Sequence, residues 1–222
     1  MNTIIAIYAG VFLLLFMSAE VAYRFLGVKA EVTRKYVHIS TGLLTLGFPF
    51  FIGSLAGVIL LCAGFTVVLL VARRFGLLPA IDGVKRKTYG SVLYPLAIVL
   101  SFTAYRHFGS PVFYFVPVLI LALSDPLAAW AGHRIPLGRY RIFKHRKSWG
   151  GSSAFAVSAA LTTWVVLTFA GDFGVGQRAL YAVVLGLITS VIEAASSKGW
   201  DNLTIPVGAI GSLALLQSIP VF

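Results

Sequence analysis

The sequence predicts an all-α membrane protein: a single-domain helix bundle over residues 1–222, with about eight transmembrane helices and both termini outside. Two observations predict this class. The chain is 59% hydrophobic and only 11% charged, with a mean hydropathy of +0.92. A soluble domain of this length could not bury so much apolar surface. The positive charges also fall in alternate loops between apolar runs, which is typical of a polytopic protein.

The predicted spans follow from apolar runs near the length of about 20 residues that crossing a bilayer requires. The first run has no basic segment before it, so we expect an uncleaved span and not a signal peptide. The second is short and contains Gly42, Gly47, Pro49 and Gly53, so a bent or re-entrant segment is an alternative. The expected spans are residues 3–22, 38–53, 54–72, 90–106, 111–131, 151–170, 178–196 and 203–220.

The distribution of Lys and Arg predicts the orientation of these spans. The chain has 18 such residues, and all except Arg106 and Arg178 fall in the first, third, fifth and seventh loops. Basic residues of short loops stay in the cytoplasm. An even number of spans with both termini outside keeps this alternation. The reactive residues of the odd-numbered loops would then share the cytoplasmic face.

Charge and cysteine content exclude several other classes. A net charge of +11 would suggest nucleic acid in a soluble protein, but here the charge lies beside membrane spans and forms no soluble basic face. We therefore expect no nucleic-acid partner. Cys62 is the single cysteine, so no intrachain disulfide is possible. No Cys/His cluster has the spacing of a zinc site.

Asp125 is the most informative of the seven carboxylates, because it lies inside an apolar run. An ionised Asp in a span costs about 2.5–3.5 kcal/mol on insertion scales, so such a residue usually has a partner or a function. Pro126 follows and would free backbone carbonyls next to it. We interpret Asp125 as a catalytic residue or metal ligand. The alternative is a packing pair with a buried Arg.

Glu193 and the pair Asp201-Asn202 are expected near the same membrane face as Asp125, at the end of one span and the start of the next. Mg²⁺ binds oxygen ligands and typically uses one or two carboxylates together with substrate phosphates. We therefore predict a Mg²⁺ site of Asp125, Glu193, Asp201 and Asn202. Capping of the last helix is the alternative for Asp201-Asn202.

Three cationic segments are expected to face one cytoplasmic pool. In the fifth loop Lys147, Ser148, Gly150, Gly151 and Ser152 lead into a helix, whose first N–H groups favour anions. The alternative is a basic loop with Ser152 or Ser153 as the helix N-cap. The second segment consists of Arg34, Lys35 and His38, and the third of Lys85, Arg86 and Lys87. Each of these two lies at the entrance of a span, where basic residues alone could simply set the topology. Together the three segments indicate a polyphosphate ligand.

At this point the chain resembles the membrane family of CTP-dependent lipid-alcohol kinases, which includes dolichol, phytol and diacylglycerol kinases. The resemblance covers roughly residues 30–210. It is carried by the order and spacing of several motifs, and no single motif is decisive. They are Arg34-Lys35-x-x-His38, Lys87-Thr88-Tyr89-Gly90, Asp125 with Gly132, Lys147-Ser148-x-Gly150-Gly151-Ser152, and Glu193 with Asp201-Asn202-Leu203-Thr204-Ile205-Pro206.

The resemblance implies transfer of the γ-phosphoryl group of a nucleoside triphosphate, typically CTP, to the hydroxyl of a membrane lipid alcohol. It places Arg34, Lys35, Asp125 and Gly132 in the catalytic core. The chain departs from the family pattern where it has Ser124-Asp125 in place of Gly-Asp, and at Gly132-His-Arg-Ile-Pro136. Two other functions stay open: a cytidylyltransferase acting on a lipid phosphate, and a transporter or channel, although no internal repeat supports transport.

Overall fold

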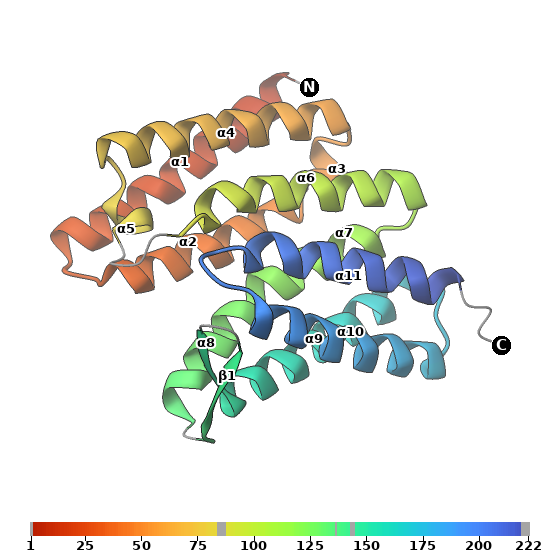
Figure 1. Cartoon of the computed structure of the whole chain (residues 1–222). Helices are drawn as coiled ribbons and strands as arrows, with labels where there is room; N and C mark the ends of the chain where they lie inside the picture. Colours follow the sequence, from red (N-terminus) through yellow and green to blue (C-terminus); the bar gives the residue numbers. More distant parts are fainter. Residues whose placement is uncertain (1, 84–87, 136, 143–144, 219–222) are drawn as a thin grey trace.

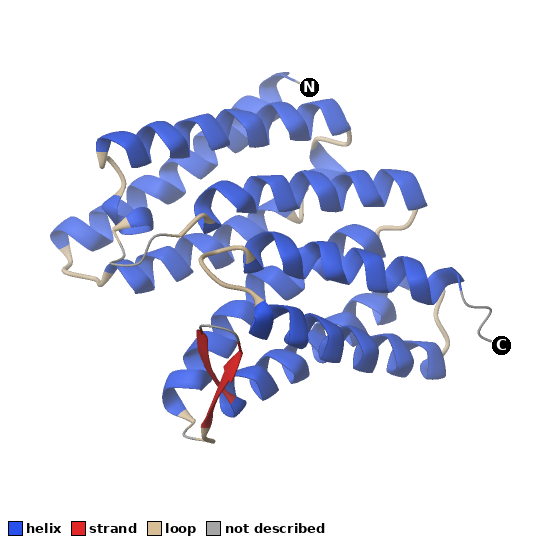
Figure 2. Cartoon of the chain, viewed as in Figure 1, coloured by secondary structure: helices blue, strands red, loops and turns tan. Residues whose placement is uncertain are grey.

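The computed structural model describes residues 2–83, 88–135, 137–142 and 145–218, which form a bundle of long helices (Figures 1 and 2). The helical membrane bundle is confirmed, with one exception to the all-α class. Strands β1 (Arg139–Ile142) and β2 (His145–Ser148) pair antiparallel within the fifth loop. Hydropathy does not predict this hairpin, because it is short and polar.

The helices follow the expected spans closely. Within the described ranges, five helical segments are long and apolar enough to cross a membrane: α1, α4, the continuous helix 112–134, α9 and α10. Helices α6 and α11 are not among the five, so length and composition support fewer crossings than the eight expected. The bounds are α1 (Asn2–Phe25), α4 (Leu55–Phe75), α6 (Gly90–Phe108), α9 (Trp149–Ala170), α10 (Val175–Ala195) and α11 (Asp201–Ser218).

The second expected span, 38–53, is wrong as a single helix. Helix α2 (Ala30–Thr45) begins well before His38, and a separate short helix, α3 (Phe48–Phe51), follows it. Pro49 lies in the first turn of α3, where its missing N–H is tolerated. A further short helix, α5 (Pro79–Asp82), lies in the third loop. The cationic residues of the second segment are consequently inside α2.

The fifth expected span is one helix with a widened turn. It consists of α7 (Val112–Leu119), a π turn η1 (Ile120–Ser124) and α8 (Asp125–Arg134). Pro126 has no N–H, so a carbonyl one turn earlier needs another donor. The ring Nε2 of His38 lies 2.9 Å from the Leu121 carbonyl oxygen and satisfies it. The widened turn thereby ties α2 to the start of α8.

Close helix packing accounts for several of the glycines. A Cβ on Gly186 would lie 2.7 Å from the Ala156 carbonyl oxygen, so α9 and α10 approach at backbone distance. Helix α4 packs mainly on α6, while α1 packs on α2 and α5 and barely touches α4. Figure 1 shows these elements as neighbouring layers. Helices α1 and α4 meet mainly through aromatic side chains, such as Phe12 and Phe65.

Candidate active site

A single cavity of about 850 Å³ collects almost all of the predicted site residues. They come from α2, α8, the hairpin, the start of α9, the end of α10 and the start of α11. Gly150 is not at the cavity wall, and Lys87, like Lys85 and Arg86, lies outside the described residues. The predicted residues that line the cavity are Arg34, Lys35, His38, Asp125, Gly132, Lys147, Ser148, Gly151, Ser152, Glu193, Asp201 and Asn202.

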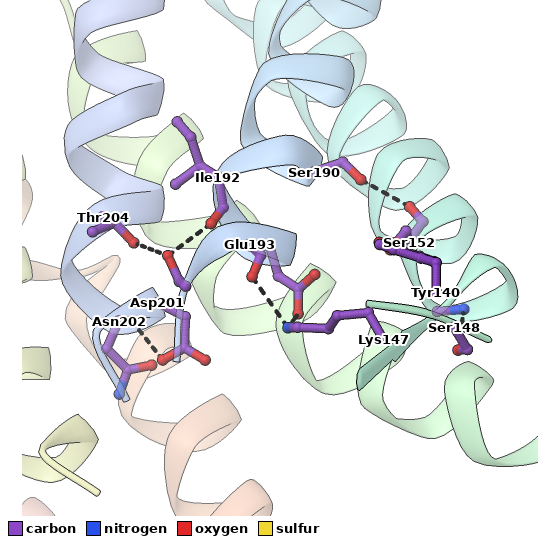
Figure 3. A network of polar contacts seen from close by, with 12 residues as sticks. Tyr140, Lys147, Ser148, Ser152, Ser190, Ile192, Glu193, Asp201, Asn202 and Thr204 are labelled. Atoms are coloured by element: carbon purple, nitrogen blue, oxygen red, sulfur yellow. Dashed lines mark hydrogen bonds and ion pairs between the residues drawn. The ribbon is translucent and has the colours of Figure 1, made fainter. Parts of the chain in front are cut away.

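Lys147 and Glu193, which both line the cavity, form an ion pair (Figure 3). The Lys147 ammonium binds the Glu193 carboxylate and also donates to the Glu193 backbone carbonyl at 3.1 Å. Glu193 is only 7% exposed. The cation thus lies at the C-terminal end of α10, where the helix dipole also favours positive charge. Glu193 acts here as the counter-ion of Lys147.

The start of α9 is built around Ser148. Its hydroxyl oxygen accepts a hydrogen bond from the Gly151 N–H at 3.1 Å, so Ser148 is the N-cap, and the alternative that gave this role to Ser152 or Ser153 is wrong. The Ser152 hydroxyl instead bonds to the Tyr140 hydroxyl, and the Ser152 carbonyl accepts from Ser190 at 3.0 Å. Figure 3 shows these contacts holding the hairpin and α10 against the first turn of α9.

The glycines of this region have a steric role that the sequence did not reveal. A Cβ on Gly132 would lie 2.9 Å from the Ser148 hydroxyl oxygen. One on Gly151 would lie 3.0 Å from the Ala128 carbonyl oxygen, and one on Gly150 2.9 Å from the Ile135 carbonyl oxygen. These residues therefore let α8 and the α9 N-terminus approach at backbone distance, whatever else they bind.

Asp125 is half-buried at the cavity wall, at the first position of α8. It lines the same cavity as the carboxylates of Asp201 and Glu193 and the cations of Lys147 and Arg34. Arg34 pairs with Glu31 at 3.1 Å, so the described structure does not show the alternative of an Asp125–Arg packing pair. The Arg34 Nε atom is buried and has no hydrogen-bond partner among the described residues. Both groups have capacity left for a ligand.

The predicted metal ligands all line the cavity but differ in how far other residues already engage them. In the described part of the chain, no three His, Cys, Asp or Glu side chains are grouped closely enough to hold a metal ion by themselves. Glu193 is engaged by Lys147. Asp201 begins α11, and its carboxylate accepts from the Asn202 N–H at 3.0 Å. The Asn202 side-chain amide donates to the Gly90 carbonyl at 2.8 Å, which leaves its amide oxygen available.

Sequence reasoning missed several residues at the cavity wall. The Tyr94 hydroxyl donates to the His38 carbonyl at 3.1 Å, and Ser91 donates to Asp82 at 3.0 Å. Gly199 has φ +87°, and a Cβ there would lie 2.3 Å from the Gly90 nitrogen. The Lys-Thr-Tyr-Gly motif ending at Gly90 is the one signal that pointed to this end of α6. Arg139 and Arg146 of the hairpin also line the cavity.

The fold and the cavity together define a helical membrane protein with an interior site of facing carboxylates and cations. Over 201 residues the chain is 35% identical to a phytol kinase of Synechocystis sp., an alignment that covers 87% of this chain and 82% of that protein. The chain therefore belongs to the lipid-alcohol kinase family that its motifs resemble. No family model matches the chain, and no solved structure matches it.

The Lys147–Glu193 pair predicts a stability effect that is separate from activity. Lys147→Met should lower the free energy of unfolding by roughly 3–5 kcal/mol, because it leaves a buried carboxylate without its counter-ion. Lys147→Met combined with Glu193→Met should recover most of the loss. Thermal unfolding of the purified proteins in detergent measures this, with the exposed Lys29→Met as control. A single variant as stable as the wild type would contradict the role of the pair.

Proposed function

We propose that this protein transfers the γ-phosphoryl group of a nucleoside triphosphate, CTP in particular, to the hydroxyl of a membrane lipid alcohol. One observation carries the proposal. Most of the described motif residues, although they come from distant segments of the chain, line one cavity, which continues into an apolar part between α1, α2, α4 and α6. Membership in the lipid-alcohol kinase family supports the reaction, and the motif resemblance supports CTP as the donor.

The cationic side of the cavity suits the phosphates of the nucleotide. Arg34, Lys35 and Lys147 line it together with Arg139 and Arg146 of the hairpin. The capped N-terminus of α9 adds backbone N–H groups and the positive end of its dipole. Charge-assisted hydrogen bonds of this kind are among the strongest that a protein offers to phosphate. The unpartnered Nε of Arg34 is one donor available for them.

The acidic side suits the chemistry of transfer, which depends on positioning and electrostatic stabilisation. Asp125 would accept the proton of the lipid hydroxyl or bind metal. A Mg²⁺ ion would be held by Asp125 and Asp201 with the Asn202 amide oxygen and substrate phosphates, which fits the one or two carboxylates that Mg²⁺ usually takes. It would neutralise charge on the transferring group. Glu193 would keep Lys147 aimed into the cavity.

We further infer eight crossings, with both termini outside and the site at the cytoplasmic face. Figure 1 supports this inference, because α1 begins and α11 ends at the end of the bundle opposite the hairpin and the α1–α2 and α10–α11 connections. The basic loops and the polar part of the cavity share that hairpin end, as the positive-inside rule requires of cytoplasmic loops.

Product analysis tests the reaction. Purified protein is incubated with γ-labelled CTP, ATP, GTP or UTP, Mg²⁺ and a panel of lipid alcohols. The expected products are a labelled lipid monophosphate and a nucleoside diphosphate, with CTP the preferred donor. Release of pyrophosphate with formation of a CDP-lipid from a lipid phosphate would identify a cytidylyltransferase instead. Absence of turnover with every nucleotide would reject the proposal.

Asp125 provides a residue-level prediction. Asp125→Asn should reduce kcat by about 10²- to 10⁴-fold, the range that loss of a general base produces, while insertion and folding persist. Steady-state rates and gel filtration in detergent measure both properties. The matched control is Asp172→Asn, a carboxylate exposed in the α9–α10 connection. Near-wild-type turnover of Asp125→Asn would make its role structural.

Cysteine labelling tests the orientation. Arg141 lies in the hairpin and Asp172 in the α9–α10 connection, two segments at opposite ends of the bundle in Figure 1. Both residues are exposed, and the native Cys62 is buried. In sealed inside-out vesicles, an impermeant maleimide should label Arg141→Cys and spare Asp172→Cys, and right-side-out vesicles should show the reverse. Labelling of both positions from one side would contradict the eight-span arrangement.

A further inference from the structure

The cavity of the proposed kinase has a second, apolar part that the motif residues do not occupy. We call it the tail limb and define it by Phe12 and Phe16 of α1, Cys62, Phe65 and Leu69 of α4, and Ile98 of α6. We propose that the tail limb holds the hydrocarbon chain of the lipid alcohol inside the protein, with the hydroxyl at the Asp125 end. This assignment rests on the proposed function.

The lining of the cavity becomes less polar along two helices. In α6 it runs from Ser91 through Tyr94 to the apolar Ile98, and in α2 it runs from the charged Arg34 through His38 to the uncharged but polar Thr45. The Tyr94–His38 hydrogen bond sets the two helices at the same level. From His38 to Thr45 the rise is about 10 Å at 1.5 Å per residue. A cavity that is charged at one end and apolar at the other matches an amphiphile.

The side chains that line the tail limb are largely buried. Phe12 is 4% exposed, Leu69 5% and Cys62 7%. Protein interiors are otherwise packed as densely as organic crystals, and unfilled apolar volume lowers stability. Apolar cavities also hold water poorly. An apolar lining in the same cavity as the predicted reacting groups is therefore suited to an apolar chain.

The packing of the surrounding helices explains why the space exists. Helix α4 packs on α6 and α1 packs on α2 and α5, while the backbones of α1 and α4 have few close contacts. These two helices meet through aromatic side chains instead: the Phe12 and Phe65 ring centroids lie 5.1 Å apart, and those of Phe16 and Phe65 5.7 Å apart. Edge-to-face rings separate backbones more than small residues do. The polar edges of a nucleotide base would find few partners here, since the Thr45 hydroxyl already donates to Gly42 at 2.8 Å.

Photo-crosslinking tests the location without requiring turnover. An isoprenoid alcohol with a diazirine at the end of its chain is irradiated with the wild type and with Asp125→Asn in detergent, and adducts are mapped by mass spectrometry. We expect adducts at Phe12, Cys62 or Phe65 in both proteins, and competition by unlabelled alcohol. Adducts confined to lipid-facing residues such as Leu14 and Leu60, which are 66% and 64% exposed, would overturn the proposal.

Chain-length selectivity gives a second measurement. Cys62→Trp fills the tail limb, and we expect it to lower kcat/KM for a long-chain isoprenoid alcohol at least tenfold more than for a short-chain one. Cys62→Leu should give a smaller effect in the same direction, which keeps the test valid if the Trp variant misfolds. The control is Leu60→Trp on the outer face of α4. Equal losses for both alcohols would contradict the proposal.

The outcomes separate this inference from the proposed function. Crosslinking in the tail limb without phosphorylation of any lipid alcohol would preserve the binding site and reject the kinase reaction. Phosphorylation with crosslinks only at the outer surface would preserve the reaction and reject the tail limb.

Discussion

The ion pair between Lys147 and Glu193 is the interaction on which the rest of the site depends. Both groups are mostly buried, so each needs the other to offset the cost of removing charge from water. The pair fixes β2 against the end of α10. Ser148, the next residue along, then caps α9, and the first turn of α9 faces the cavity. A contact between distant segments thus positions β2 and the first turn of α9 at the cavity.

A second constraint comes from Pro126 and determines the position of Asp125. Because proline cannot donate, the helix through residues 112–134 widens at η1, and His38 of α2 takes the free Leu121 carbonyl. Asp125 begins the helix immediately after this turn. The carboxylate is therefore placed by a local backbone defect that a neighbouring helix stabilises. Widened turns of this kind often occur at functional sites, and here the turn lies beside a carboxylate that lines the cavity.

The sequence predicted the helices well, because apolar runs and loop charges are local signals. It also predicted which residues meet, since the family motifs supplied their order and spacing. It did not predict the hairpin or the Ser148 cap, which are set by hydrogen bonds within a few residues, and it gave the break after Thr45 only as the alternative of a bent second span. Nor did it predict the approach of Gly90 to Gly199 and Asn202, because those contacts join segments more than a hundred residues apart. Hydropathy likewise leaves α6 and α11 undecided as spans, since buried helices can carry polar residues.

The division of the cavity follows from the cost of polar groups in lipid. Placing a charged side chain in the middle of a bilayer costs free energy, so charged residues lie near helix ends. Basic residues of the loops also lie mostly on one face of the membrane. Helices α2 and α6 both begin at that face, where α2 carries Arg34 and Lys35, and Ile98 of α6 lines the cavity further along. A nucleotide arrives from water and a lipid alcohol from the bilayer. Helix ends that join a charged compartment to an apolar one are where those two substrates can meet, which is why we place the phosphates at the hairpin and the hydrocarbon chain between α1 and α4.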